Sequence, residues 1–95
     1  MLEHEYPLRD GRRLVARFDL ADSISRSAVE CQSWRWHATP AAQHRDAERK
    51  RLARRLGWDF AECWWTDLDR MDAVAADFLV VLDRQRRLLA LTAAS

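Results

Sequence analysis

The feature that most constrains the fold is a capped helical segment in the middle of the chain. Thr39 and Pro40 form a typical helix start, because the threonine side chain accepts a first-turn N–H and proline fits the first helical position. No helix breaker follows until Gly57, a residue that readily adopts the left-handed conformation found at helix ends. We therefore predict a helix over residues 40–56.

A second helix is predicted directly after this glycine. Its signal is a set of apolar residues spaced three or four apart, which would share one helical face: Phe60, Trp64, Leu68, Met71, Ala75 and Phe78. The centre of the chain is therefore expected to be an αα-hairpin, formed by helices at about 40–56 and 60–77.

The N-terminal third carries strand signals. Asp10-Gly11 is a dipeptide favoured in tight hairpins, and it lies between two apolar segments. Residues 27–37 contain few helix formers and would place Trp34 and Trp36 on one side of a strand. A helical alternative stays open, because one broad arc of a helical wheel would also hold Leu14, Phe18, Ala21, Ile24, Ala28 and Cys31.

The C-terminal segment permits two interpretations. Residues 78–83 and 87–92 are apolar and flank a short polar stretch, as in a β-hairpin, and Val80 and Val81 favour strands. Alternatively, the second helix continues to about residue 92 and places Gln85 at a core-facing position. We favour the hairpin. The predicted fold is a single α+β domain over residues 1–95, with N-terminal strands, a central αα-hairpin and a C-terminal β-hairpin; an all-α bundle is the alternative.

Composition places the chain among small globular proteins. Its 95 residues are 48% hydrophobic with a net charge of +1, which suits one folded domain rather than a disordered chain. No uncharged apolar run approaches the length of a membrane span, and the N-terminus lacks the apolar core of a signal peptide. Cys31 and Cys63 are too few for a disulfide framework and are expected to be buried free thiols. We expect a cytoplasmic protein without a membrane role.

The residues do not form a recognisable catalytic or metal-binding pattern. A Cys–His nucleophile needs an oxyanion-binding loop, and both glycines are better explained as a turn and a helix cap. Zinc ligands usually come in closely spaced pairs, which do not occur among Cys31, His37, His44 and Cys63. A calcium loop needs a glycine and a bidentate glutamate, and these are missing from the acidic run Asp67, Asp69 and Asp72. We expect no enzymatic activity, no metal and no cofactor.

The charges are strongly segregated along the chain. Residues 1–56 carry 12 basic and 8 acidic side chains, residues 57–83 carry one basic and seven acidic side chains, and residues 84–95 add three arginines. Such a dipolar distribution favours association with a complementary partner or with a second copy of the chain.

The surplus of tryptophan suggests a protein-binding function. Five tryptophans exceed what a small core usually needs, and Trp65 is predicted to lie outside the apolar arc of the second helix, among acids. Packing of Trp65 under the N-terminal strands is the alternative. We expect a non-enzymatic interaction module, such as an inhibitor, adaptor or accessory factor of a bacterium or phage. It would bind another protein, or itself as a homodimer, through Trp65, Glu62, Asp69 and Asp72.

The alternative function is nucleic-acid binding through the first helix. One broad basic face of this helix is predicted to hold Lys50, Arg51, Arg54 and Arg55. Trp34 and Trp36 would add a stacking platform beside it. A solvated helix face, or contact with an acidic protein, would also explain this charge.

Overall fold

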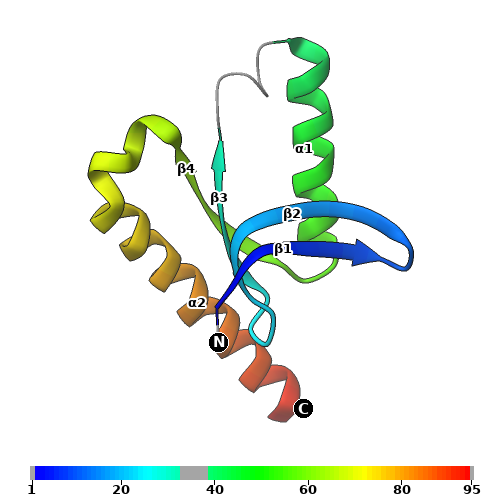
Figure 1. The fold of residues 1–95 in the computed structure, drawn as a ribbon. Helices are drawn as coiled ribbons and strands as arrows, with labels where there is room; N and C mark the ends of the chain where they lie inside the picture. Colours follow the sequence, from blue (N-terminus) through cyan, green and yellow to red (C-terminus); the bar gives the residue numbers. More distant parts are fainter. Residues whose placement is uncertain (1, 33–38, 95) are drawn as a thin grey trace.

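The computed structural model describes residues 2–32 and 39–94 and has an α+β fold, in which a four-stranded mixed sheet lies between two helices (Figure 1). The sheet order is β1-β2-β3-β4; the first three strands are antiparallel, and β4 is parallel to β3. In chain order the elements are β1 (Glu3–Asp10), β2 (Arg13–Asp22), β3 (Ser27–Gln32), α1 (Pro40–Arg55), β4 (Asp59–Trp64), the 3-10 helix η2 (Trp65–Arg70) and α2 (Met71–Ala94).

The helix predicted at 40–56 is confirmed as α1. The Thr39 hydroxyl accepts a hydrogen bond from the Ala42 N–H at 3.1 Å, and Pro40 occupies the first turn. Gly57 follows the helix with φ +87°, a conformation that favours glycine, and lets the chain turn directly into β4. The helix connects β3 to β4 and so makes their parallel pairing possible.

The predicted N-terminal strands are also confirmed. β1 and β2 form an antiparallel hairpin around Gly11, which adopts φ +61° in the turn. The helical alternative for this region is therefore wrong. β3 confirms the first part of the strand predicted over 27–37, whereas Trp34 and Trp36 lie outside the described residues.

The second helix predicted at 60–77 is wrong over its first half. Residues 59–64 form β4, which pairs in register with β3 from Ser27↔Asp59 to Gln32↔Trp64, and α2 begins only at Met71. Phe60 and Trp64 share a side in a strand as well as in a helix, because a spacing of four satisfies both periods. Pairing with β3, which local spacing does not report, decides between the two.

The predicted C-terminal β-hairpin is wrong as well. α2 runs unbroken from Met71 to Ala94, as the alternative interpretation proposed, and Gln85 is buried on its sheet-facing side. The β-propensity of Val80 and Val81 is overridden because Val81 packs with Phe78 against the sheet. Within the described residues, no helix combines the length and apolar character needed to cross a membrane.

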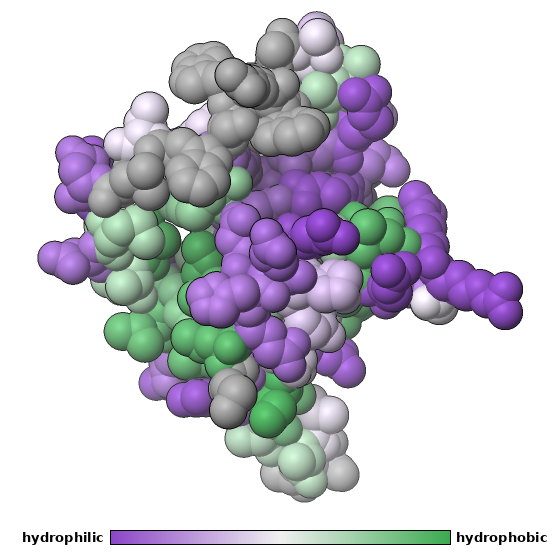
Figure 2. Space-filling view, in the orientation of Figure 1, coloured by the Kyte–Doolittle hydropathy of each residue, from purple (hydrophilic) through white to green (hydrophobic). Residues whose placement is uncertain are grey.

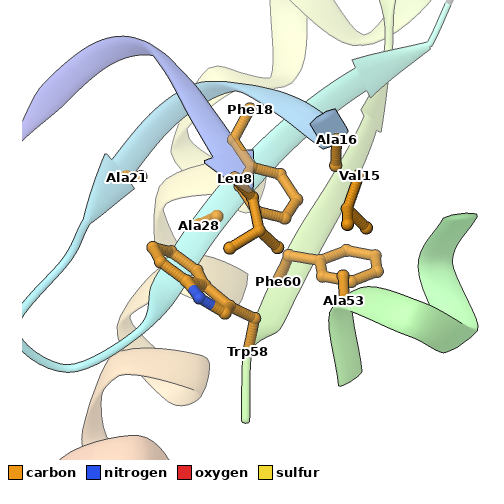
Figure 3. Close-up of a cluster of buried hydrophobic side chains, with 9 residues drawn as sticks. All are labelled: Leu8, Val15, Ala16, Phe18, Ala21, Ala28, Ala53, Trp58 and Phe60. Atoms are coloured by element: carbon orange, nitrogen blue, oxygen red, sulfur yellow. The ribbon is translucent and has the colours of Figure 1, made fainter. Parts of the chain in front are cut away.

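The core is divided by the sheet into two clusters. On the α1 side, aromatic rings pack around Trp58, whose centroid lies 5.3 Å from that of Phe18 (Figure 3). The Tyr6 ring is tilted against Trp58, with the centroids 5.1 Å apart. On the α2 side, side chains of β3 and β4 pack against the helix: Val29, Ala61, Cys63, Val74, Phe78 and Val81. The two clusters fix the positions of α1 and α2 on opposite faces.

Cys31 and Cys63 form a disulfide, so the expectation of free thiols is wrong. The two residues are direct partners in the parallel β3–β4 pairing, and their Cα atoms are 4.4 Å apart. In-register pairing places both side chains on the same face of the sheet, which the separation of 32 residues in sequence conceals. The two cysteines therefore no longer support the expectation of a cytoplasmic protein.

Candidate functional site

The sheet splits at Asp19, and this split creates the candidate site. β2 pairs with β3 only over Leu20–Asp22, while its preceding residues continue with β1 as a curved two-stranded hairpin (Figure 1). At the split, the Cys31 N–H donates to the Asp19 carboxylate at 2.7 Å. The Asp19 side chain thus takes the place of the strand carbonyl that would continue the β2–β3 ladder. Beyond this point β2 no longer pairs with β3, and a space remains between β2, β3 and α1.

A groove follows α1 from this split. Its largest cavity, about 790 Å³, lies between β2, β3 and the first half of α1, and its lining includes Arg17, Asp19, Glu30, Arg45 and Arg49. Two smaller cavities, of about 360 and 190 Å³, continue toward the end of the helix. Neighbouring cavities share Arg45 and Arg49, then Arg13 and Leu52, so together they form one feature, the α1 groove.

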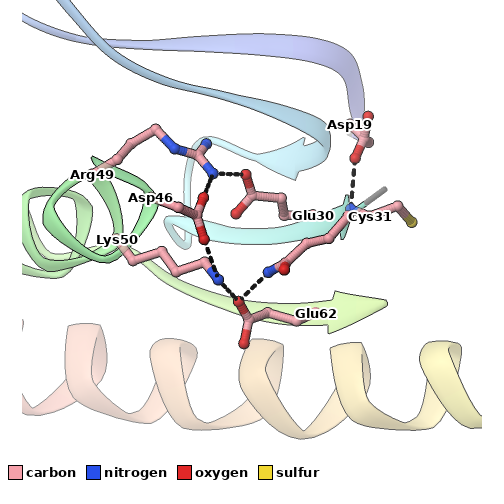
Figure 4. A network of polar contacts seen from close by, with 8 residues as sticks. Asp19, Glu30, Cys31, Asp46, Arg49, Lys50 and Glu62 are labelled. Carbon is pink, nitrogen blue, oxygen red and sulfur yellow. Dashed lines mark hydrogen bonds and ion pairs between the residues drawn. The ribbon is translucent and has the colours of Figure 1, made fainter. Parts of the chain in front are cut away.

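An ion-pair network closes the floor of the groove (Figure 4). Arg49 pairs with both Glu30 of β3 and Asp46 of α1. Lys50 pairs with Asp46, at 2.8 Å, and with Glu62 of β4, and the Gln32 side-chain amide donates to Glu62 at 2.7 Å. The network ties α1 to both central strands.

Glu30 is incompletely satisfied in this network. Its side chain is only 8% exposed, and within the described residues its buried Oε2 atom has no hydrogen-bond partner. Burial raises the pKa of Glu30, and the charge and hydrogen bond of Arg49 offset this only in part. A ligand that donates an N–H or O–H at this point would complete the carboxylate.

Asp46 shows the opposite balance. Burial by itself raises the pKa of Asp46, but the hydrogen bonds and positive charges of Lys50 and Arg49 together outweigh burial and lower the pKa below its ordinary value. Asp46 is therefore a structural anion that holds both cations in place.

The walls of the groove carry four exposed arginines together with exposed acids, among them Glu5, Asp10 and Asp19. The four arginines line it without an ion-pair partner in the part of the chain that the structure describes: Arg13, Arg17, Arg45 and Arg55. Guanidinium groups bind planar oxyanions through paired N–H groups and remain charged at all physiological pH values. The groove can therefore receive phosphate or carboxylate groups along its length.

The basic helix face predicted from the sequence is only partly available. Lys50 is 17% exposed and is engaged by Asp46 and Glu62. Arg51 pairs with Glu48 on the outer surface at 3.2 Å, and the Arg54 guanidinium lies 4.5 Å from the centre of the Phe60 ring. Of the predicted basic residues, Arg55 lines the groove. Sequence reasoning missed Arg13 and Arg17, because only the fold brings β2 alongside α1.

The acidic helix face predicted from the sequence is not formed as one surface. Glu62 lies on β4 and pairs with Lys50, because residues 59–64 are a strand. Asp69 lies in η2, and Asp72 is exposed in the first turn of α2, where it interacts favourably with the helix dipole. Trp65 is the first residue of η2, and its side chain lies outside the described part of the structure.

The fold and the groove together define a small α+β domain with an arginine-lined groove along its crossover helix. Across residues 2–32 and 39–94, no three His, Cys, Asp or Glu side chains gather closely enough to hold a metal ion. Comparison with protein families, with curated proteins and with solved structures finds no match to this chain.

Proposed function

We propose that this protein binds nucleic acid along the α1 groove. The observation that carries the proposal is the row of four exposed, unpaired arginines, contributed by β2 and α1 and described above. α1 has 16 residues and is therefore about 24 Å long, which spans several successive phosphates of one strand. Contacts to phosphate predominate in such an interface and provide affinity without sequence preference.

The placement of the charges supports an anionic partner, although the exposed acids Glu5, Asp10 and Asp19 also line the groove. The buried acids on the floor are already neutralised by Arg49 and Lys50, so they oppose an incoming polyanion only weakly. The arginines on the walls have no ion-pair partner among the described residues, and each phosphate that one of them contacts releases condensed counterions from the nucleic acid. A repeating row of cations fits a polymer with one phosphate per nucleotide.

The proposal is tested by fluorescence anisotropy with labelled single-stranded and duplex DNA and RNA over a series of salt concentrations. Arg17→Ala combined with Arg45→Ala should weaken binding and reduce the slope of log K against log salt by about 1.4–1.8. The matched control is Arg70→Ala combined with Arg86→Ala, which removes two exposed arginines outside the groove, from η2 and α2. Equal loss of affinity in the two double variants, or no binding by the wild type, would reject the groove.

We also propose that the function is not enzymatic, in line with the absence of a catalytic pattern in the sequence. The same oligonucleotides are incubated with the protein and Mg²⁺, and they should remain intact. Cleavage that Glu30→Gln or Asp19→Asn abolishes would overturn this part. Carboxylates that hold Mg²⁺ against a phosphate would then be the explanation.

Protein binding is the second candidate function, at a different surface from the one predicted from the sequence. The surface predicted for it loses Glu62 to the ion-pair network, whereas α2 exposes large apolar side chains to solvent. That exposure favours a contact through α2, which carries Asp72, rather than through Trp65, Glu62 and Asp69.

A further inference from the structure

α2 is apolar on more than the side that packs against the sheet. Its buried residues Val74, Phe78, Val81 and Gln85 fall within about 60° of one another on a helical wheel. On the far side of the wheel, Leu79 is 61% exposed and Val80 is 56% exposed. Hydrophobic colour follows α2 in Figure 2, in contrast to the hydrophilic surface near α1. Exposed apolar side chains grouped on one helix usually mark an interaction site.

The outer face of α2 carries opposite charges near its two ends, which a two-fold axis can pair, and a further acid, Asp83, close to its centre. This face is centred about 180° from the buried stripe on the helical wheel, and it includes Asp72, Leu79, Val80 and Arg87. Asp72 lies seven residues before Leu79, and Arg87 lies seven residues after Val80. A two-fold axis between Leu79 and Val80 would place these apolar residues against their symmetry mates. The same axis brings Asp72 of each copy opposite Arg87 of the other, as an isologous interface requires.

We propose that two copies of this chain pair through the outer faces of antiparallel α2 helices. The small side chain of Ala76, which is also exposed on this face, lets the helices approach closely beside the central apolar residues. Arg87 already pairs with Asp83 of its own helix at 3.0 Å, but both side chains are more than half exposed, so this contact is weak and leaves Arg87 free to bridge. The α1 groove lies on the opposite face of the sheet and remains open in the dimer.

The pairing is expected to be reversible. A single helix pair is at the low end of interface size, so we expect a dissociation constant on the order of micromolar. Sedimentation equilibrium over a concentration series should show a mass that rises from 11.2 kDa toward twice that value. A mass of 11.2 kDa at every concentration would overturn the proposal.

Two variants of matched exposure locate the interface. Val80→Asp should raise the dissociation constant at least about tenfold, because it places like charges beside the symmetry axis. Leu88 is also 56% exposed on α2 but lies about 80° away on the wheel, on the edge of the sheet-facing side. Leu88→Asp should therefore leave the dimer intact. Dissociation by Leu88→Asp, or persistence of the dimer in Val80→Asp, would overturn the proposed face.

Charge reversal tests the antiparallel arrangement. Asp72→Arg should weaken the dimer, because it would face Arg87 of the other copy. The double variant Asp72→Arg with Arg87→Asp exchanges the two charges and should restore association. If the double variant is no stronger than the single one, the proposed antiparallel register is wrong.

Discussion

Gln85 is expected to be the most sensitive polar side chain of α2. Its amide nitrogen donates to three backbone carbonyls from two separate connections, those of Ser25 at 3.3 Å, Arg26 at 2.8 Å and Gly57 at 2.8 Å. An amide carries two N–H groups, so one of these contacts is shared. The side chain thus joins the β2–β3 turn, the α1–β4 turn and α2 at one point.

The cost of Gln85→Leu can be worked out from these contacts. The Arg26 carbonyl keeps a partner, because it also accepts the Asp59 N–H at 3.1 Å, but Ser25 and Gly57 lose the bond from Gln85. Leaving a buried carbonyl without a partner costs about 1–3 kcal/mol. The Ser25 contact is buried, but the Gly57 contact is only partly buried and its carbonyl can be hydrated, so we expect a loss of about 2–3 kcal/mol in the free energy of unfolding, which in a domain of this size lowers the Tm by about 10–20 °C.

The matched control is Gln32→Leu. Gln32 is 7% exposed and Gln85 is 8% exposed, but within residues 2–32 and 39–94 Gln32 donates to a single acceptor, Glu62, which also receives Lys50. This variant should cost only about 0.5–1.5 kcal/mol. Urea unfolding of both variants compares the two losses. A loss below about 0.5 kcal/mol for Gln85→Leu, or a larger loss for Gln32→Leu, would refute the reasoning.

Two further predictions concern the strands beneath the helices. Because burial raises the pKa of Glu30, the folded protein binds this proton more tightly than the unfolded chain, and stability falls as the pH rises from the ordinary glutamate value through the raised one. Glu30→Gln should gain stability relative to the wild type over that range; a constant difference between about pH 4 and pH 8 in urea unfolding would contradict this. Reduction of the Cys31–Cys63 disulfide, which links residues 32 apart, should lower the free energy of unfolding by about 3–4 kcal/mol, whereas the Cys31→Ala, Cys63→Ala double variant should not respond to reductant.

The parts of the fold that local chemistry specifies could be predicted from the sequence. The start of α1 is signalled by Thr39 and Pro40 and its end by Gly57, and these residues lie at the ends of the helix itself. The β1–β2 turn is likewise set by Asp10-Gly11. In both cases the groups that decide the structure are neighbours in the chain.

The parts that were missed depend on partners far away in sequence. Phe60 and Trp64 satisfy a helix as well as a strand, and pairing with β3, more than 30 residues earlier, selects the strand. α2 places Gln85 against carbonyls 28 to 60 residues away, and these contacts are absent from any local pattern. The groove combines arginines of β2 with arginines of α1 for the same reason.

β3 belongs both to the core and to the candidate site, because its successive side chains alternate between the two faces of the sheet. Ala28 packs in the apolar cluster on the α1 side, and Val29 packs on the α2 side. Along β3, the face that carries Ala28 next carries Glu30 and then Gln32. Both of these polar residues are buried. Apolar residues at these positions would extend the cluster around Phe60 and stabilise the domain more than an imperfectly paired carboxylate does.

This polar end of β3 is therefore better explained by binding than by stability. A chain of this size has a small margin of stability, and the buried Glu30 oxygen, for which the described residues provide no partner, reduces that margin. Glu30 lies at the point where β2 leaves the sheet, where Asp19 accepts the Cys31 N–H in place of a strand carbonyl, and where the largest cavity of the groove lies. Unfavourable polar groups that gather at the mouth of an arginine-lined groove favour a site that is completed by a ligand.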